Sequence, residues 1–315
     1  MTILNTAVCA LNGGNTGISN CSVDFNTLNK GFLVPTDFVL TEAQLVSPAT
    51  VMAALIAAAS ANIASQRIYP LPETLTVTDN SEAAVQQTYG YGAVVTVRDG
   101  MANIAVNWKK GGLCLRNQLA KFNGNSWAWL AIDAEGRLIG TKVGKTMKGI
   151  PLNEFYQDPF KWADGANQTA YIYKLSYNTR YINSDVAFVP LNYGEVSAIS
   201  GLINIVPELV TYPGANIFTV RLLAGCAKDN LYDLYSTALA NVANFSVVNA
   251  TTGNAITITS VTVDANSKGF IFTLNSSDPD YVAGGPFVVS GSTVSALATN
   301  LVVGFEILPL TIVTP

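Results

Sequence analysis

The alternation of apolar and polar residues between positions 111 and 141 predicts a short helix followed by a β-hairpin. Apolar side chains recur at the helical spacing of i, i+4 and i+7 at Leu115, Leu119 and Phe122. A helix with this spacing can lay one apolar stripe on a sheet. The dipeptide Asn123-Gly124 should end the helix, because Gly and Asn favour the left-handed conformation that follows a last helical turn.

The next segment, 126–133, is typical of a strand whose two faces are both apolar. Successive side chains of a strand point to opposite faces, which places Trp127 and Trp129 on one face. Leu130 and Ile132 then point to the other face. The tetrapeptide Asp-Ala-Glu-Gly that ends this segment suits a hairpin turn. We therefore expect the helix and hairpin to form the centre of a domain that is covered on both sides.

A second helix is predicted over residues 48–65. A capping box at Thr41–Gln44 and the pair Ser47-Pro48, which supplies an N-cap and a proline at the first helical position, mark its start. Its many alanines permit close approach to a sheet or to another helix, although alanine is more often simply a strong helix former.

Strands are expected after this helix over residues 74–80, 93–100 and 102–110. Asp99-Gly100 is a strong signal for a hairpin between the last two of them. The Gly- and Tyr-rich stretch 86–92 is expected to be a flexible connection between the first two. A strand with a tyrosine face is predicted over 171–177 from the alternation of its residues.

These patterns predict a mainly β protein in three parts. Residues 1–40 are polar and rich in Gly and Asn, and are either a disordered leader or an extended N-terminal arm ordered by a neighbouring subunit; we favour the arm. Residues 41–213 are expected to form a β-barrel or sandwich for assembly, with one long flanking helix and the helix-hairpin. Residues 214–315 contain short strands separated by turns, which predicts a C-terminal β-sandwich after a linker at 212–214.

Composition favours an assembled protein. Charged residues make up only 12% of the chain and hydrophobic residues 49%, with a mean hydropathy of +0.31, whereas about 25% charged residues are usual. A monomer covered by neutral polar residues is one explanation, and surface buried between identical subunits is the one we favour. The net charge of −4 argues against nucleic-acid binding as the main task, although ordinary solubility also accounts for it.

The ends and the cysteines bear on location. The first residues lack a basic region and a sustained apolar run, so no signal peptide is expected, and the Ala-rich run 49–64 is too weak for a membrane span. The four cysteines, which form no C-x-x-C pair and are accompanied by no histidine, give no metal site and are treated as structural: Cys9, Cys21, Cys114 and Cys226. Cys9 and Cys21 could bridge, but free thiols are favoured without a secretion signal.

Motifs that could carry chemistry were weighed individually. Residues 140–146 resemble a phosphate-binding loop but place three residues between their glycines instead of four. The carboxylate pairs Asp133/Glu135 and Asp278/Asp280 could bind calcium or cleave glycosides, but both lie in turns, where such residues serve the backbone. The tryptophans of 126–133 and the tyrosines of 171–177 could stack on sugars or bases, yet core packing is favoured. We therefore predict no catalytic, cofactor-binding or metal-binding residue and no enzyme.

The segment 109–148 is locally basic, with eight basic residues against two acidic ones: Lys109, Lys110, Arg116, Lys121, Arg137, Lys142, Lys145 and Lys148. Such a run suits either a surface that faces an acidic partner in head-to-tail stacking or an ordinary solvated face.

An arm, one alanine-rich helix and an appended β-sandwich in a chain of low charge resemble a tailed-bacteriophage virion protein, most like a tail tube subunit. Residues 238–274 resemble bacterial Ig-like modules. The resemblance implies homo-oligomeric rings, with a hexamer as one candidate, that stack into a conduit with an acidic lumen through which DNA passes non-specifically. The arm and the loop 80–92 would make contacts between rings, and the basic run departs from a uniformly acidic surface.

This resemblance places the protein in the virion after assembly in the host cytoplasm, with other virion proteins as partners and no membrane. Two other functions stay open at this stage. One is a capsid or decoration protein, and the other is a module that binds glycans or a host surface through loops such as Asn275 to Gly285.

Overall fold

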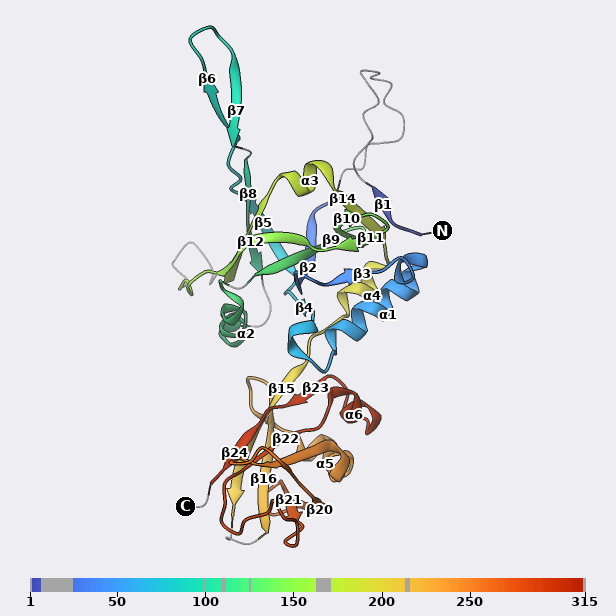
Figure 1. Cartoon of the computed structure of the whole chain (residues 1–315), viewed down its shortest axis with the longest axis vertical. Helices are drawn as coiled ribbons and strands as arrows, with labels where there is room; N and C mark the ends of the chain where they lie inside the picture. Colours follow the sequence, from blue (N-terminus) through green and yellow to red (C-terminus); the bar gives the residue numbers. More distant parts are fainter. Residues whose placement is uncertain are drawn as a thin grey trace. The chain divides into compact units, whose positions relative to one another are not determined.

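The computed structural model describes residues 2–6, 25–98, 100–108, 112–124, 126–162, 171–212 and 216–313. Strands dominate, as the sequence predicts, and they form several sheets in two compact units. The first unit extends to Ala59 and continues from Ile63 to Ser200, whereas the second comprises Ser60–Asn62 and the described chain from Gly201 onward. The colours of Figure 1 follow the chain through both units.

The first unit is built on one large sheet with the strand order β1-β14-β10-β9-β12-β13-β8-β5, to which β2 and β4 are joined through β9, and β3 through β11. Its strands are β1 (Asn5–Thr6), β2 (Leu28–Pro35), β3 (Val39–Leu40), β4 (Tyr69–Pro70), β5 (Thr74–Asp79), β6 (Val85–Thr88), β7 (Val94–Arg98), β8 (Met101–Trp108), β9 (Trp127–Asp133), β10 (Arg137–Val143), β11 (Thr146–Lys148), β12 (Ile150–Gln157), β13 (Tyr171–Asn178) and β14 (Val186–Pro190). Its helices are α1 (Pro48–Ala59), α2 (Gly112–Leu119), α3 (Arg180–Ser184) and α4 (Tyr193–Ser197), with short 3-10 turns at Gln44–Val46, Ala64–Gln66 and Ala120–Phe122.

Strand β9 lies between two hydrophobic cores, as its two apolar faces predict. Leu130 and Ile132 belong to the core beneath α1, together with Leu55 of that helix. Trp129 belongs to the other core, which also contains Tyr173 of the tyrosine strand. The helix after residue 111 is confirmed as α2 with its 3-10 extension to Phe122, and the hairpin returns through β10.

Three expectations for this unit are corrected. Residues 28–40 are not an arm, because β2 pairs with β9 along nearly its whole length and Phe32, Leu33 and Val34 are fully buried. A run of three large apolar residues suits a strand covered on both faces, which the polar composition around it obscures. The part of the predicted arm at 7–24 lies outside the described residues.

Helix α1 ends at Ala59 instead of 65, and a 3-10 turn at Ala64–Gln66 follows. Its buried side chains are Val51, Met52, Leu55 and Ala59, whereas Ile63 is 55% exposed and extends no helical stripe. The longer prediction counted Ile63 in the apolar stripe of the helix, whereas packing of the apolar face ends the helix at Ala59.

The hairpin predicted at Asp99-Gly100 is wrong. Strand β7 pairs with β6, while β8 pairs with β5 and β13, so the two strands on either side of this dipeptide do not pair with each other. The chain instead turns at Tyr89–Gly92, in the middle of the stretch expected to be a flexible connection. Residues 74–108 therefore form one long hairpin with two successive ladders.

The second unit is a β-sandwich. One sheet has the order β20-β21-β16-β15-β23 with β17 on β16, and the other has the order β19-β18-β22-β24. The strands are β15 (Ile203–Thr211), β16 (Ile217–Ala224), β17 (Asp229–Asn230), β18 (Phe245–Asn249), β19 (Ala255–Ile256), β20 (Ile258–Asp264), β21 (Gly269–Leu274), β22 (Phe287–Gly291), β23 (Phe305–Ile307) and β24 (Leu310–Ile312). The helices are α5 (Tyr232–Leu239) and α6 (Val294–Thr299), with a 3-10 turn at Val242–Asn244.

Aromatic rings hold the two sheets of this unit together. Phe218 stacks on Phe272 within the first sheet at 5.0 Å between ring centroids. Phe287 and Phe245 of the second sheet approach this pair at 5.0 and 4.8 Å. The unit begins about a dozen residues before the predicted linker at 212–214, because β15 pairs with β16 instead of serving as a connection.

Candidate assembly surface

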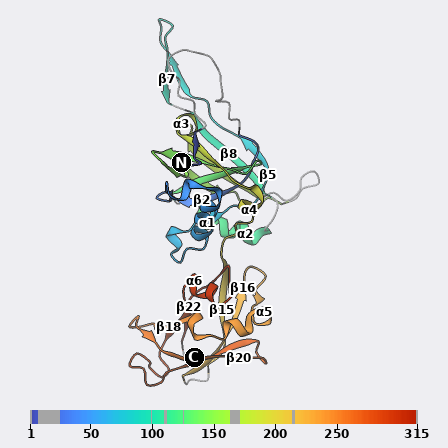
Figure 2. The ribbon, with the colours of Figure 1, turned by 90° about the vertical axis from the view of Figure 1, so that its right-hand side faces the viewer.

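The outer half of the long hairpin, residues 85–97, is here called the ribbon. Its strands β6 and β7 pair only with each other and continue β5 and β8 away from the other strands of the unit (Figures 1 and 2). Backbone hydrogen bonds from the Asn80 amide to the Asn103 carbonyl (2.8 Å) and from the Glu82 amide to the Met101 carbonyl (2.9 Å) join the two ladders. Every described residue of β6 and β7 is exposed.

The ribbon carries exposed valines that nothing in the described chain covers. The register pairs Gln86 with Thr96, which places these polar side chains on one face. Strand alternation then puts Val95 and Val97 on the opposite face, where they are 48 and 61% exposed and lie beside Gln87, the cross-strand partner of Val95. A two-stranded ribbon is at best marginally stable in water unless another layer covers it.

The tip of the ribbon presents two aromatic rings. Tyr89 and Tyr91 stack at 5.9 Å between centroids and 14° between planes, and Tyr91 is 82% exposed. The turn is closed by a 2.8 Å hydrogen bond from the Gly92 amide to the Tyr89 carbonyl. Gly92 has φ of +84°, a conformation that favours glycine.

The ribbon carries no charge. Residues 83–97 contain no Asp, Glu, Lys or Arg, and the nearest charged pair, Arg98 and Glu82, forms a 3.2 Å ion pair at the root. Edge and surface strands are usually protected from association by charged residues. Here the exposed segment lacks that protection, so it has the properties of a surface that is covered in an assembly.

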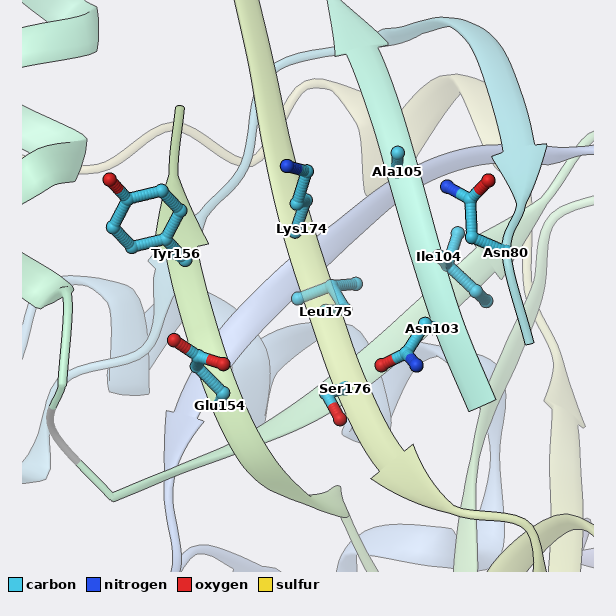
Figure 3. A pocket seen from close by; sticks show the side chains of 9 residues that line it. All are labelled: Asn80, Asn103, Ile104, Ala105, Glu154, Tyr156, Lys174, Leu175 and Ser176. Atoms are coloured by element: carbon cyan, nitrogen blue, oxygen red, sulfur yellow. The ribbon is translucent and has the colours of Figure 1, made fainter. Parts of the chain in front are cut away.

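A polar hollow of about 420 Å³ opens on the face of the sheet next to the root of the ribbon (Figure 3). Glu154 and Tyr156 come from β12, Lys174 and Ser176 from β13, and Asn103 from β8. The Lys174 ammonium lies 2.9 Å from the Asp158 carboxylate, so its charge is already paired. The hollow offers hydrogen-bonding groups and one ion pair, which suits a polar contact.

The first carboxylate pair serves a turn, as turn statistics predict. Asp133 is fully buried, and its Oδ1 accepts hydrogen bonds from the amides of Glu135 (3.0 Å) and Arg137 (2.9 Å). Its Oδ2 accepts a 2.6 Å hydrogen bond from Arg137 Nε, while Glu135 pairs with the same guanidinium at 3.1 Å. Asp133 therefore holds the β9–β10 turn together.

The second pair has the same role in the sandwich. Asp278 accepts hydrogen bonds from the amides of Thr257 (2.8 Å) and Asp280 (3.1 Å), and the bond from Thr257 is the main reason that its pKa is lowered. Asp280 Oδ1 accepts from the side-chain amide of Asn254 at 2.9 Å. These bonds cross-link the loop that follows Asn275, where the glycan-binding alternative placed its ligand.

Residues 140–146 do not form a phosphate-binding loop, because they lie on β10 and its tight turn into β11. Such a loop requires a helix after its glycines. Lys145, the residue that would contact phosphate, instead lies 2.9 Å from Glu42 in an exposed ion pair.

The basic run is not one uncompensated surface. Arg116 donates to the Asp158 carbonyl at 3.0 and 3.2 Å, Arg137 pairs with Asp133 and Glu135, and Lys145 pairs with Glu42. Lys109 and Lys110 lie outside the described residues. Arg116, Arg137 and Lys145 are thus neutralised or bonded locally, which favours the ordinary solvated face over a basic docking face.

The aromatic strand residues belong to the core. Trp129, Tyr173 and Tyr177 are buried, and burial raises the pKa of Tyr177 to about 12, with the Asp79 charge as a smaller cause. Trp127 is partly buried against Phe122, at 5.3 Å between ring centroids. None of these rings is presented for stacking on a sugar or a base.

Cys114 takes part in a disulfide, and so does Cys226, whereas Cys9 and Cys21 lie outside the described residues. Among the residues that the structure describes, no group of three or more His, Cys, Asp or Glu is placed to hold a metal ion. None of the described helices combines the length and the apolar character that crossing a membrane requires.

Comparison with known proteins adds no family to this picture: no protein-family model matches the chain, and neither does any curated protein.

Proposed function

We propose that the chain is a structural subunit that assembles with further copies of itself, and that the ribbon makes one of the contacts between copies. The observation that supports this most directly is the uncharged ribbon with its exposed, uncovered valines, among them Val85, Val95 and Val97. Large exposed apolar surfaces on soluble proteins usually mark interaction sites. Exposed strands, in addition, associate readily with other chains.

The particular assembly that we propose is the tail tube of a bacteriophage, in which rings of subunits stack into a conduit for DNA. The resemblance stated above supports it, as do the alanine-rich flanking helix and the C-terminal sandwich. Since residues 28–40 are part of the first unit, the ribbon takes over most of the inter-ring contact that the resemblance assigns to an N-terminal arm. A capsid or decoration protein would use the same surface in a different lattice.

The test compares the full chain with a variant that lacks the ribbon. In this variant an Asn-Gly turn replaces residues 83–100, so that a two-residue turn connects Glu82 and Met101, which are hydrogen-bonded across the hairpin. Strands β5 and β8 keep their ladder, and the variant should fold. Circular dichroism and thermal unfolding check that it does.

Sedimentation velocity and negative-stain electron microscopy then report assembly. We expect rings or tubes from the full chain and monomers from the shortened variant. Uniform monomers of the full chain at every concentration tested would rule out the proposal and leave the glycan-binding alternative, which a glycan array with the full chain then examines. Unchanged assembly of the shortened variant would show that another surface joins the subunits.

A further inference from the structure

The second unit contains a hollow of about 760 Å³ between the end of α5, strand β20 and the end of α6. Every described residue that lines it is uncharged. Hydroxyl groups come from Thr237, Thr259 and Ser260, and apolar surface comes from Val242 and Leu301. Such a mixture suits a ligand group that is largely apolar and has one or two hydrogen-bonding atoms.

The lip of this hollow carries a strained leucine. Leu301 has φ of +66°, a conformation in which a non-glycine residue is disfavoured, and its side chain is 79% exposed. Hydrogen bonds from the amides of Leu301 to Ala298 (3.1 Å) and of Val302 to Leu297 (2.9 Å) fix this turn after α6. Packing within the chain does not explain a leucine here, so a function of the exposed side chain is the better explanation.

The floor of the hollow is pre-formed. The side-chain amide of Asn300 donates to the side chain of fully buried Asn244 at 2.8 Å, and Asn241 donates to Asn300 at 3.1 Å. Asn244 in turn donates to the Ala238 carbonyl at 2.8 Å. This network ties α5, the 3-10 turn and α6 together, so the hollow keeps its form without a ligand.

We propose that this hollow receives the tip of the ribbon, Tyr89–Gly92, from another copy of the chain. The inference rests on the proposed function, since it names the partner of the ribbon. Tyr89 and Tyr91 offer apolar rings that end in hydroxyl groups, which is the chemistry that the hollow accepts. Tyrosine is also among the residues that most often anchor protein interfaces.

Charge distinguishes this receptor from the polar hollow on the sheet face of the first unit. The hollow on the first unit contains Glu154 and Lys174, and covering them with an uncharged tip would remove charges from water without new partners. The hollow of the second unit has no such charge to desolvate. Because the tip and its receptor are different surfaces, one copy can insert its tip into a second copy while its own hollow receives the tip of a third, and such a head-to-tail contact generates rings or open stacks.

The first experiment locates the tip by photocrosslinking. Tyr91→p-benzoylphenylalanine in unlabelled protein is mixed with nitrogen-15-labelled wild type, so that mass spectrometry distinguishes contacts between copies. We expect labelled peptides that contain residues 237–242 or 299–303. Trp162→p-benzoylphenylalanine is the matched control, because Trp162 is an aromatic residue of similar exposure (84%) outside the ribbon, and should not label that hollow.

Crosslinks from position 91 to the sheet face at Glu154–Ser176, to any other region, or to nothing while the protein is assembled would overturn the inference and leave the proposed function intact. Absence of assembly in the wild type, read by sedimentation before irradiation, would overturn both. The two failures are therefore distinguishable.

The second experiment separates docking from folding at the lip. Leu301→Gly relieves the positive φ and removes the side chain, so we expect an unchanged or higher thermal midpoint together with assembly weakened by about tenfold or more. Leu301→Glu should weaken assembly further, whereas Leu234→Glu, at an exposed leucine on α5 that does not line the hollow (75% exposed), should leave it unchanged. Full-strength assembly of Leu301→Gly would overturn the inference.

Discussion

The first unit contains two hairpins that differ in what surrounds them. In the β9–β10 hairpin, apolar side chains on both faces of β9 enter two separate cores, and β2 and β12 pair along its edges. In the β6–β7 ribbon, Val85, Val95 and Val97 remain about half exposed, and each strand pairs only with the other. The comparison teaches that apolar residues on a strand can be covered on both faces within the chain or left exposed; in the assembly proposed above, another copy of the chain covers the exposed ones.

The largest effect on this comparison should come from the buried hairpin. Trp129→Ala removes a ring that is 4% exposed and lies 6.1 Å from the Tyr177 ring in the second core. We expect a loss of about 3–5 kcal/mol in the free energy of unfolding, as for other large-to-small substitutions in cores. Urea unfolding monitored by circular dichroism measures it. A loss below about 1 kcal/mol would mean that this core is not tightly packed.

The turn of the same hairpin provides a graded test. Asp133→Asn removes the negative charge that pairs with the Arg137 guanidinium and places the asparagine NH2 group, a hydrogen-bond donor, against it. The substitution should lower the free energy of unfolding by about 2–3 kcal/mol. Glu135→Gln is the matched control, because its carboxylate is 55% exposed and contacts the same guanidinium. It should cost at most about 1 kcal/mol. Equal losses in the two variants, measured by urea unfolding, would contradict the role given to Asp133.

Burial of the tyrosine strand predicts a pH effect. The folded state raises the pKa of Tyr177 to about 12, while an unfolded tyrosine titrates near about 10. The contribution of protonated Tyr177 to the free energy of unfolding is complete below pH 10. It is lost as pH rises toward 12, because only the unfolded chain releases the tyrosine proton in that window. In Tyr177→Phe the free energy of unfolding should therefore fall less steeply with pH in this window, by about 1.4 kcal/mol per pH unit.

Urea unfolding at pH 9, 10, 11 and 12 measures this slope. Burial also raises the pKa of Tyr173 on the same strand, so part of the alkaline loss should remain in the variant. Identical slopes for the variant and the wild type would show that Tyr177 ionises freely in the folded protein.

The smallest effect on stability should come from the ribbon. The double variant Val95→Thr, Val97→Thr keeps the shape and strand propensity of both residues while making the exposed face polar. We expect a change below about 0.5 kcal/mol in unfolding free energy, as for other surface substitutions. Assembly, measured by sedimentation velocity, should nevertheless weaken strongly. A large loss of stability in the monomer would mean that the ribbon packs within its own chain.

Sequence alone predicted the parts of the fold where a periodic pattern and burial agree. The two-faced strand around Trp129, the helix ending at Phe122 and most strands of the second unit follow from local patterns. Strand β15 was missed because Pro207 lies inside it and proline is uncommon within strands. The strand β2 was missed because its partner β9 lies about a hundred residues away, and no local pattern reports such a pairing.

The candidate surface was only partly predictable. The turn at Tyr89–Gly92 lies between alternating segments, which is a hairpin signal, but the competing Asp99-Gly100 signal outweighed it. The hollow in the second unit had no signal at all, because it forms where α5, β20 and α6 meet. The positive φ of Leu301 depends on how α6 ends and cannot be inferred from a leucine in the sequence.

The pairing of β2 with β9 also sets an order of events during synthesis. Leu28 cannot pair until its partner Asp133 has been made, about a hundred residues later. Synthesis of that stretch takes about 5–20 s at about 5–20 residues per second. The ribbon closes between neighbours such as Thr88 and Val94 and can form as soon as they are made. The apolar run at Phe32 therefore stays unpaired for much longer than any pairing within the ribbon requires. During this interval the exposed run at Phe32 can associate with other nascent chains, so the molecule is prone to aggregation while it is being made.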